Sequence, residues 1–456
     1  MTNGPLACRS TPATIATMDD RGPRRTRRPL IALVAGLAGG LAAVVVLLAA
    51  IGGGAGRATS PPSAVATPTA QGGATPAPSD VIAERVAEVE RQVPPIRGLS
   101  PTADVPTRII DRERLRTELR AIYEQEAVAQ QYRVVGDLYE RLGLLPAATD
   151  LRQLVLDVNG AGVSGVYFPE EKEMVVVTAR GLDATARITL AHEFTHALQD
   201  QHFGLDELGI DDVGQSDRGL ARLALVEGDA TQLMVEWAAA HLSPLELLSI
   251  VVGALTPEQQ ELLQDMPPVL RRQLTFPYVD GQAFVATIKA SGGWPAVDDA
   301  YSDPPDSTEQ VLHPGAYAAR EAPIAVQLPD LEAALGEGWT SVLEDTMGEL
   351  TSQIWLEQAS GSTEPDPTPS ALSAAAGWGG DRIASYDGPG ASWAVAWQTA
   401  WDTPADAAEF RTAAAAALRG SPGTTALLGE GGDTVIVLFA SDADALDRLR
   451  APFESI

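Results

Sequence analysis

The chain has only one cysteine, Cys8, among 456 residues, so no disulfide can form within it. The same scarcity excludes a CxxC metal site and a disulfide-stapled fold. Basic residues are also few, 32 against 61 acidic ones, and the formal net charge is −29. The first 29 residues hold six arginines and two aspartates, so the remainder carries −33. A surface this acidic repels phosphate backbones, which argues against nucleic acid as a partner.

Charge is absent from residues 30–54 (LIALVAGLAGGLAAVVVLLAAIGGG), a run longer than the roughly 20 residues that a membrane-spanning helix needs. Arginines lie only on its N-terminal side, which predicts a cytoplasmic basic tail over residues 1–29 and a transmembrane helix over 30–51. A cleaved signal peptide has a shorter apolar region, of about 7–15 residues, so an uncleaved anchor is favoured. Residues 52–80 are rich in Pro, Ala, Thr and Ser and predict a semi-rigid stalk. The lipid bilayer is therefore an expected partner, and everything after the stalk is expected to be extracytoplasmic.

No internal repeat is visible after residue 80, but the hydrophobic period changes along the chain. Helical spacing over residues 81–93 and 111–145 gives way to two β-rich runs, Val163–Phe168 and Met174–Thr178, which predict a hairpin. A helix should follow, with Asp183 or Thr185 as its N-cap and Gly204 as its stop. These elements, with further helices to about residue 274, predict a mostly helical α+β domain over residues 81–326.

A second unit is expected over residues 327–456. Its pattern gives a helical stretch near Trp339–Gln358 and then a gap rich in Pro, Ser and Thr at Gly361–Ser373. Strand-like SWAVAWQTAW and DTVIVLFA follow, alternating with helix-like PADAAEFRTAAAAAL and ADALDRLR. This order predicts a small C-terminal α+β unit, and no catalytic motif is visible in it.

Histidine is scarce as well, with five in the chain, yet two of the five fall in a His-Glu-x-x-His motif at residues 192–196. Side chains four apart on a helix project from one face, so His192 and His196 can bind one ion. Glu193 lies beside them and can serve as general base for a metal-activated water. Catalytic zinc usually takes three protein ligands, so a third must be found.

His202 is one candidate for the third ligand, since HExxHxxGxxH places a histidine in that register. Gln199 stands where that pattern has glycine, however, and ALQDQ contains no helix breaker. On a continued helix His202 lies about 9 Å along the axis from His196 and points about 120° away, beyond the reach of a shared zinc. His202 is then a polar residue in the last turn of the helix.

Glu227 is the stronger candidate. It lies in the apolar stripe of a helix predicted over about Arg218–His241. A buried carboxylate is costly unless it is paired or bound to a metal, and no lysine is nearby. The alternative is a salt bridge to Arg218, to Arg222 or to another helix. Gly228 is expected to let this helix lie close to the histidine helix.

HExxH on one helix and a glutamate ligand on a following helix resemble the gluzincin metallopeptidases, the thermolysin-like class. HEFTHALQDQHF, ALVEGDA and STEQVLHP are closer still to a group of anchored or secreted prokaryotic HExxH proteins of poorly defined function. The resemblance covers roughly residues 162–323. It implies Zn²⁺ as cofactor, with His192, His196 and Glu227 as ligands and Glu193 as base. The chain departs from the class at Thr231, where an aspartate normally orients a ligand histidine; Asp229 and Asp200 are candidate replacements.

Peptide hydrolysis also needs a donor for the developing oxyanion. The thermolysin class uses a histidine and a tyrosine, which makes His313 a candidate catalytic residue, with Tyr317 second, in DPPDSTEQVLHPGAYA. The sequence thus predicts a membrane-anchored zinc metallopeptidase acting on peptides or proteins outside the membrane. Two alternatives stay open: a zinc-stabilised, catalytically inert envelope-binding or organising ectodomain, and a metzincin-like protease that uses His202.

Overall fold

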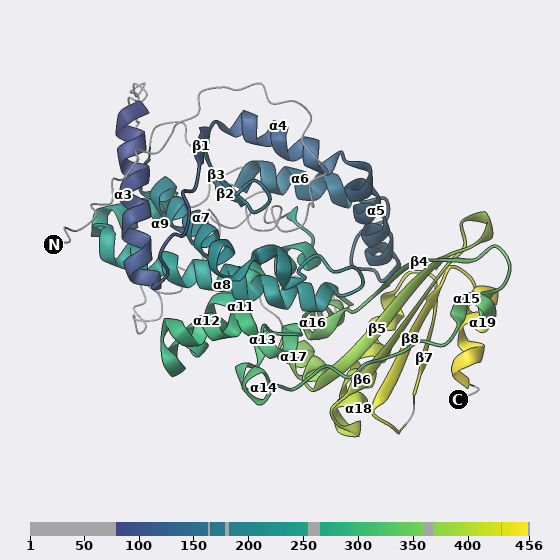
Figure 1. Cartoon of the computed structure of the whole chain (residues 1–456). Helices are drawn as coiled ribbons and strands as arrows, with labels where there is room; N and C mark the ends of the chain where they lie inside the picture. The colour runs from purple at the N-terminus through teal and green to yellow at the C-terminus, as the bar shows by residue number, and fades with distance from the viewer. Residues whose placement is uncertain are drawn as a thin grey trace, which may run out of the picture.

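The structure, a computed structural model, describes residues 79–162, 165–177, 182–253, 265–359, 368–429 and 431–454. The predicted basic tail, the apolar segment and nearly all of the stalk lie outside these residues. Among the helices that are described, none combines the length and the apolar character needed to cross a membrane. The fold is mixed α and β, with a helical N-terminal part and a sheet-containing C-terminal part (Figure 1).

Four helices lie in the first part of the described chain, three where helical spacing predicts helix and a fourth that was not foreseen. They are α3 (Ser79–Arg97), α4 (Arg112–Tyr123), α5 (Glu126–Arg141) and the unforeseen α6 (Leu151–Gly162). The side chain of Asp111 caps α4 by accepting from the backbone N–H of Arg114. Figure 1 shows α4, α5 and α6 along one side of the N-terminal part and α3 at its far end.

The predicted hairpin is confirmed as β2 (Gly165–Phe168) and β3 (Glu173–Val177), which pair antiparallel. A third strand was not predicted: β1 (Thr107–Ile110) pairs in parallel with β3, giving the order β1-β3-β2. β2 therefore forms one edge of this sheet and packs against the helix that follows the hairpin.

The helix that carries the HExxH motif is α7 (Ala184–Phe203). Asp183 is its N-cap, with the carboxylate accepting from the N–H of Ala186, and Gly204 ends it in the left-handed conformation at φ 70°. Gly is favoured there because it has no Cβ to clash. The next long helix, α8 (Ser216–His241), starts two residues before the predicted position. Gln199 lies within α7, so the helix continues past the motif as expected.

Further helices complete the N-terminal part. They are η1 (Leu205–Leu208), α9 (Pro244–Gly253), α11 (Pro268–Gly292), α12 (Trp294–Ser302), α13 (Thr308–Leu312) and α14 (Pro314–Ala319). The longest of them, α11, lies along α8 in very close contact, because a Cβ on Gly228 would stand 2.2 Å from the carbonyl oxygen of Gly281. The expectation for Gly228 is therefore wrong in its partner: this glycine admits α11 rather than the histidine helix.

The C-terminal part holds a five-stranded antiparallel sheet of order β4-β5-β6-β8-β7. Its strands are β4 (Thr340–Asp345), β5 (Trp378–Asp387), β6 (Trp393–Trp401), β7 (Thr424–Leu428) and β8 (Thr434–Ala440). Its helices are α15 (Leu331–Leu335), α16 (Gly348–Ala359), α17 (Pro369–Ala375), η2 (Pro389–Ala391), α18 (Pro404–Ala417), η3 (Leu418–Gly420) and α19 (Ala443–Glu454). The helix predicted near Trp339–Gln358 is half wrong, because its first part is β4.

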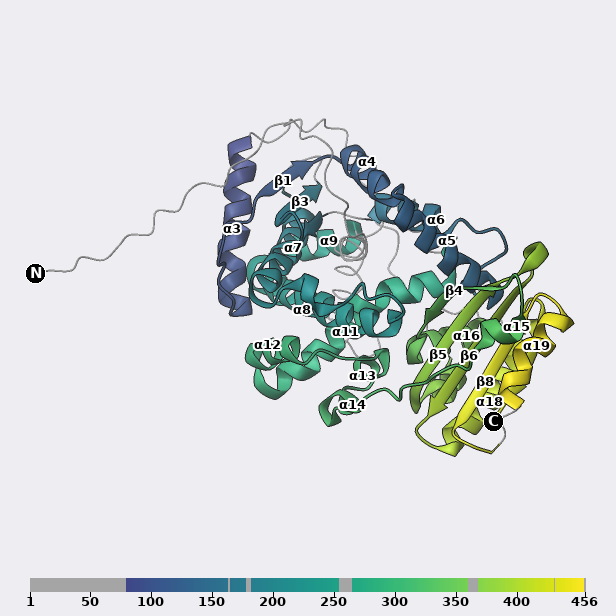
Figure 2. The same cartoon turned by 45° about the vertical axis from the view of Figure 1, so that its right-hand side comes forward.

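Helices cover both faces of this sheet (Figure 2). On one face Trp355 of α16 and Phe410 of α18 pack against Trp397 of β6, with ring centroids 5.3–6.2 Å apart. On the other face α15 and α19 contribute a separate apolar cluster that includes Leu335 and Leu449. The first cluster is continuous with the core of the N-terminal part, so the two predicted units share buried surface.

Candidate metal centre

Three side chains from two helices converge in the interior: His192 and His196 of α7 and Glu227 of α8. The Nε2 atoms of the two histidines are 3.0 Å apart, and Glu227 Oε2 lies 3.1 Å from Nε2 of His192 and 3.4 Å from that of His196. Two nitrogens bound to one tetrahedral zinc lie about 3.3 Å apart, given Zn–N of about 2.0–2.1 Å. This buried group can therefore hold a metal ion.

The burial of Glu227 supports the same conclusion. Its side chain is fully buried, and Oε1 has no hydrogen-bond partner within the described part of the chain. The alternative salt bridges are not made, because Arg218 pairs with Asp212 and Arg222 with Asp306. The two histidines are thus the only groups found with Glu227 among the described ion pairs.

Glu193 is held in place by the edge strand β2. The backbone N–H of Tyr167 donates to Glu193 Oε2 at 2.8 Å, while Oε1 is buried without a partner in the described structure. Gly165 of β2 makes this approach possible, since a Cβ there would lie 3.0 Å from Glu193 Cγ and 2.7 Å from Thr189 Cγ2. The hairpin predicted before α7 is therefore in contact with the predicted base.

His202 does not join the metal group. It is exposed at the C-terminal end of α7, and its Nε2 lies 2.7 Å from the carbonyl oxygen of Ser100. The three residues that converge include Glu227 instead. The geometric argument against a ligand at this helical position thus agrees with the structure.

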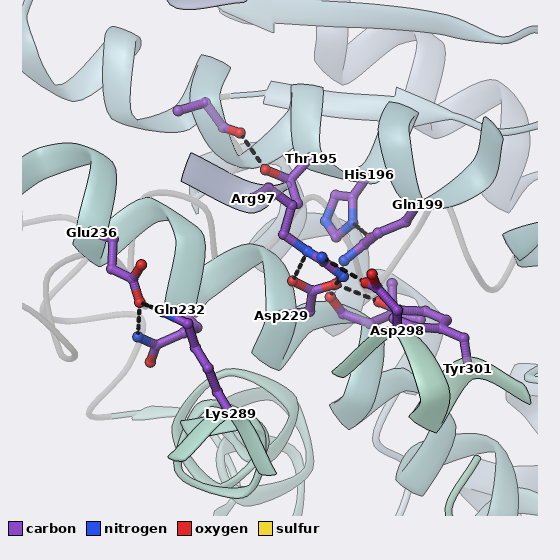
Figure 3. Close-up of polar contacts among 12 residues, drawn as sticks. Arg97, Thr195, His196, Gln199, Asp229, Gln232, Glu236, Lys289, Asp298 and Tyr301 are labelled. Atoms are coloured by element: carbon purple, nitrogen blue, oxygen red, sulfur yellow. Dashed lines mark hydrogen bonds and ion pairs between the residues drawn. The ribbon is translucent and has the colours of Figure 1, made fainter. Parts of the chain in front are cut away.

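The candidate replacements for the missing orienting aspartate are wrong. Asp229 receives a bidentate contact from Arg97, at 2.7 and 2.9 Å, and a hydrogen bond from Tyr301 Oη (Figure 3). Asp200 accepts from Tyr167 Oη and Lys172 Nζ. Both carboxylates serve other pairs, and neither is hydrogen-bonded to His192 or His196 among the described contacts.

Gln199 supports a ligand histidine instead, and sequence reasoning gave it no such part. Its Oε1 lies 2.8 Å from His196 Nδ1 (Figure 3), and its Nε2 donates to the carbonyl oxygen of Val226 at 3.0 Å. The available signal is its spacing, since a residue three positions after His196 on a continued helix lies on the same face. Tyr278 of α11 was also missed; its ring stacks near that of His192, with centroids 6.2 Å apart.

His313 is not brought to this group. Its side chain is half exposed, and its Nε2 lies 3.0 Å from Glu349 Oε1 at the start of α16. Tyr317, the second candidate, donates to the carbonyl oxygen of Asp303. Nearby contacts reach α8 at Asp217, ten residues before Glu227 and so about 15 Å along the axis. The prediction of His313 as oxyanion donor thus finds no support in the geometry, because the segment that carries it packs against the first turn of α8.

The electrostatics of the group follow from burial and mutual pairing. Burial raises the pKa of Glu193 to about 8, against the opposing effects of His196 and the Tyr167 N–H. Burial lowers the pKa of His192. For the coupled pair, burial is outweighed by mutual attraction, so the pKa of His196 is raised and that of Glu227 is lowered. Metal binding to His196 would therefore release a proton.

Comparison with known proteins gives little on this site. A family described as a domain of unknown function, DUF8575, matches residues 340–450, which hold none of the metal group. A crystal structure from Chloroflexus aurantiacus, described as that of a candidate hydrolase with a novel fold, shares 17% sequence identity and a TM-score of 0.33. That match covers 53% of this chain and 89% of the other. No curated protein matches the sequence.

Proposed function

We propose that this protein is a zinc-dependent peptidase of the gluzincin type, held outside a membrane by its N-terminal segment. The observation that carries the proposal is the convergence of His192, His196 and Glu227, with Glu193 beside them on the same helix. Two histidines and one carboxylate are the donor set of thermolysin-type zinc sites, in which the fourth position stays open. The anchor and its orientation are expectations from residues 1–80.

The chain's own groups supply the acid–base chemistry. When bound, zinc polarises the peptide carbonyl and activates a water for attack on it. Glu193 accepts the proton of that water at its unpartnered Oε1, while the N–H of Tyr167 fixes Oε2. The same carboxyl then gives the proton to the leaving amine.

The test uses full-length protein in detergent, loaded with zinc and dialysed. Zinc per chain is measured by mass spectrometry, and cleavage is followed on casein, an unstructured protein substrate. We expect about one zinc per chain and cleavage by the wild type. Glu193→Gln should keep the zinc and lose cleavage by at least about 100-fold, the lower range for a general base. Glu207→Gln, an exposed residue just after α7, is the matched control. Equal cleavage by Glu193→Gln and wild type would refute the assigned roles.

One observation favours the inert alternative, a metal-stabilised envelope-binding ectodomain. Glu193 is fully buried, with its stem packed against Gly165. A glutamate that never contacts a substrate would be buried in the same way. Zinc-loaded wild type that melts at a higher temperature than the metal-free form but leaves casein and a mixed peptide library intact would establish this alternative.

A further inference from the structure

The amide of Gln199 lies between the two helices that carry the metal group. It is fully buried and makes two polar contacts, one to His196 on its own helix and one to Val226 on α8. Val226 directly precedes Glu227 in the sequence. One side chain therefore touches a ligand ring and the backbone next to another ligand.

The orientation of this amide follows from its partners. The carbonyl oxygen of Val226 can only accept, so the amide nitrogen of Gln199 must face it. The amide oxygen then faces His196 Nδ1, at 2.8 Å, and can only accept as well. Nδ1 of His196 must carry a hydrogen, and this leaves Nε2 as the atom that can bind a metal.

Nε2 of His196 is also the atom that points at the other two ligands, 3.0 Å from His192 Nε2 and 3.4 Å from Glu227 Oε2. The alternative assignment, with the metal-binding lone pair on Nδ1, would place the amide oxygen against an unprotonated nitrogen. Gln199 thus selects the ring form of His196 that suits metal binding, and it fixes the ring angle.

Among the described residues, no other side chain is hydrogen-bonded to the Nδ1 atom of either histidine of the metal group. Asp229 and Asp200 are engaged elsewhere, and Nδ1 of His192 has no partner in the described structure. We infer that Gln199 is a positioning residue for the metal, fixing the His196 ring and the Val226–Glu227 turn of α8 together. This inference rests on metal binding in the proposed function and not on peptide cleavage.

Gln199→Met tests the inference, because methionine keeps the length and helix propensity of glutamine but offers no hydrogen bond to either partner. Gln201→Met is the matched control, since Gln201 lies on the same helix and contacts the backbone of Ala103 instead. Zinc affinity is measured by competition with a chromophoric chelator. Loss of an outer partner of a ligand histidine typically weakens metal affinity 10–100-fold, and we expect this for Gln199→Met and no change for Gln201→Met.

A second readout separates positioning from mere packing. With only five histidines, ¹⁵N-labelled protein allows the Nδ1–H resonance of His196 to be assigned. It should be protected from exchange in wild type and in Gln199→Glu, which keeps the acceptor for His196 while losing the donor to Val226, and lost in Gln199→Met. Gln199→Glu should also bind zinc more tightly than Gln199→Met.

Wild-type zinc affinity in Gln199→Met together with a protected Nδ1–H would overturn the inference. The resonance is recorded in metal-free protein too, so the test holds for a variant or wild type that binds no zinc. Cleavage is scored apart: zinc-loaded wild type that leaves casein intact counts against the peptidase and not against Gln199.

Discussion

Gly228 of α8 and Gly281 of α11 meet backbone to backbone. A Cβ on Gly228 would lie 2.2 Å from the carbonyl oxygen of Gly281, and a Cβ on Gly281 would lie 2.3 Å from that of Ala224. Because Gly228 directly follows Glu227, the crossing of these two helices lies next to the third residue of the candidate metal group.

Gly228→Ala should therefore damage both stability and metal binding. The added methyl group cannot be accommodated without moving α8 or α11, and overpacking of this kind costs about 1–3 kcal/mol. Chemical denaturation and zinc titration measure the two effects. Gly315→Ala, at a helical glycine of α14 with no atom within 4 Å of the added Cβ, should leave both unchanged or slightly raise stability. Unaltered zinc affinity in Gly228→Ala would show that the crossing does not position Glu227.

Gly165→Ala should act on the base and spare the metal ligands. Its Cβ would press on Glu193 Cγ and Thr189 Cγ2, so the carboxylate must shift away from the Tyr167 N–H. A displacement of about 1 Å at a reacting group can cost about 100-fold in rate. We expect kcat/KM on casein to fall by about that factor while zinc per chain stays near one. Full activity would contradict the contact between β2 and the base.

Glu227→Ala and His202→Ala together decide the ligand set. Glu227→Ala removes one of three donors and should reduce bound zinc to near zero after dialysis, as measured by mass spectrometry. His202→Ala should keep the zinc, because His202 is exposed and its ring nitrogen faces the carbonyl oxygen of Ser100 rather than the metal group. The reverse pattern would restore the metzincin-like alternative.

Stability should depend on pH through Asp217, at the start of α8. Burial raises its pKa to about 8, opposed by the hydrogen bonds from Thr308 and assisted by the charge of Asp381. The unfolded value is about 3.9, so the fold prefers the protonated acid. The stability that comes from keeping Asp217 protonated is complete below about pH 4 and is lost as the pH rises through 8. The slope is about 1.4 kcal/mol for each pH unit while one proton separates the two states.

Asp217→Asn measures that contribution, because an amide keeps an acceptor for Thr308 and cannot ionise. Urea unfolding at pH 5 and pH 8 should show a smaller loss of stability for Asp217→Asn than for wild type. The pKa of Glu309 is also raised, to about 8, and that of Asp381 to about 6, so some loss remains in the variant. An equal loss of unfolding free energy between pH 5 and pH 8 in the two proteins would show that Asp217 is not the titrating group.

Local pattern was enough to predict the elements around the site. The β-rich runs of β2 and β3, the cap at Asp183 and the stop at Gly204 are signals carried by neighbouring residues, and each one is confirmed. Glu227 was found because a carboxylate in an apolar stripe is costly, an argument that needs only helical spacing. All of these features are determined by residues that lie close together in the sequence.

Features fixed by distant contacts were missed or misread. β1 is four residues long and pairs in parallel with a strand more than sixty positions later, so no local period marks it. The stretch before α16 was read as helix, but pairing with β5 makes it β4. Gly228 was rightly expected to admit a helix, yet only the tertiary structure shows that the helix is α11. His313 was assigned by analogy with a class, and its place beside Glu349 depends on packing at the other end of α8.

Trp355 of α16 packs edge to face against Trp397 in the C-terminal sheet, while its Nε1–H donates to the carbonyl oxygen of Leu142, just after α5. Gln358 repeats the link one turn later, at the carbonyl oxygen of Leu144. The helix α16 thus packs against both the N-terminal part and the C-terminal part. The apolar core is continuous across residue 340, so the two parts should unfold together. A chain cut there would leave Trp355 Nε1–H and the Gln358 amide without the acceptors that Leu142 and Leu144 provide.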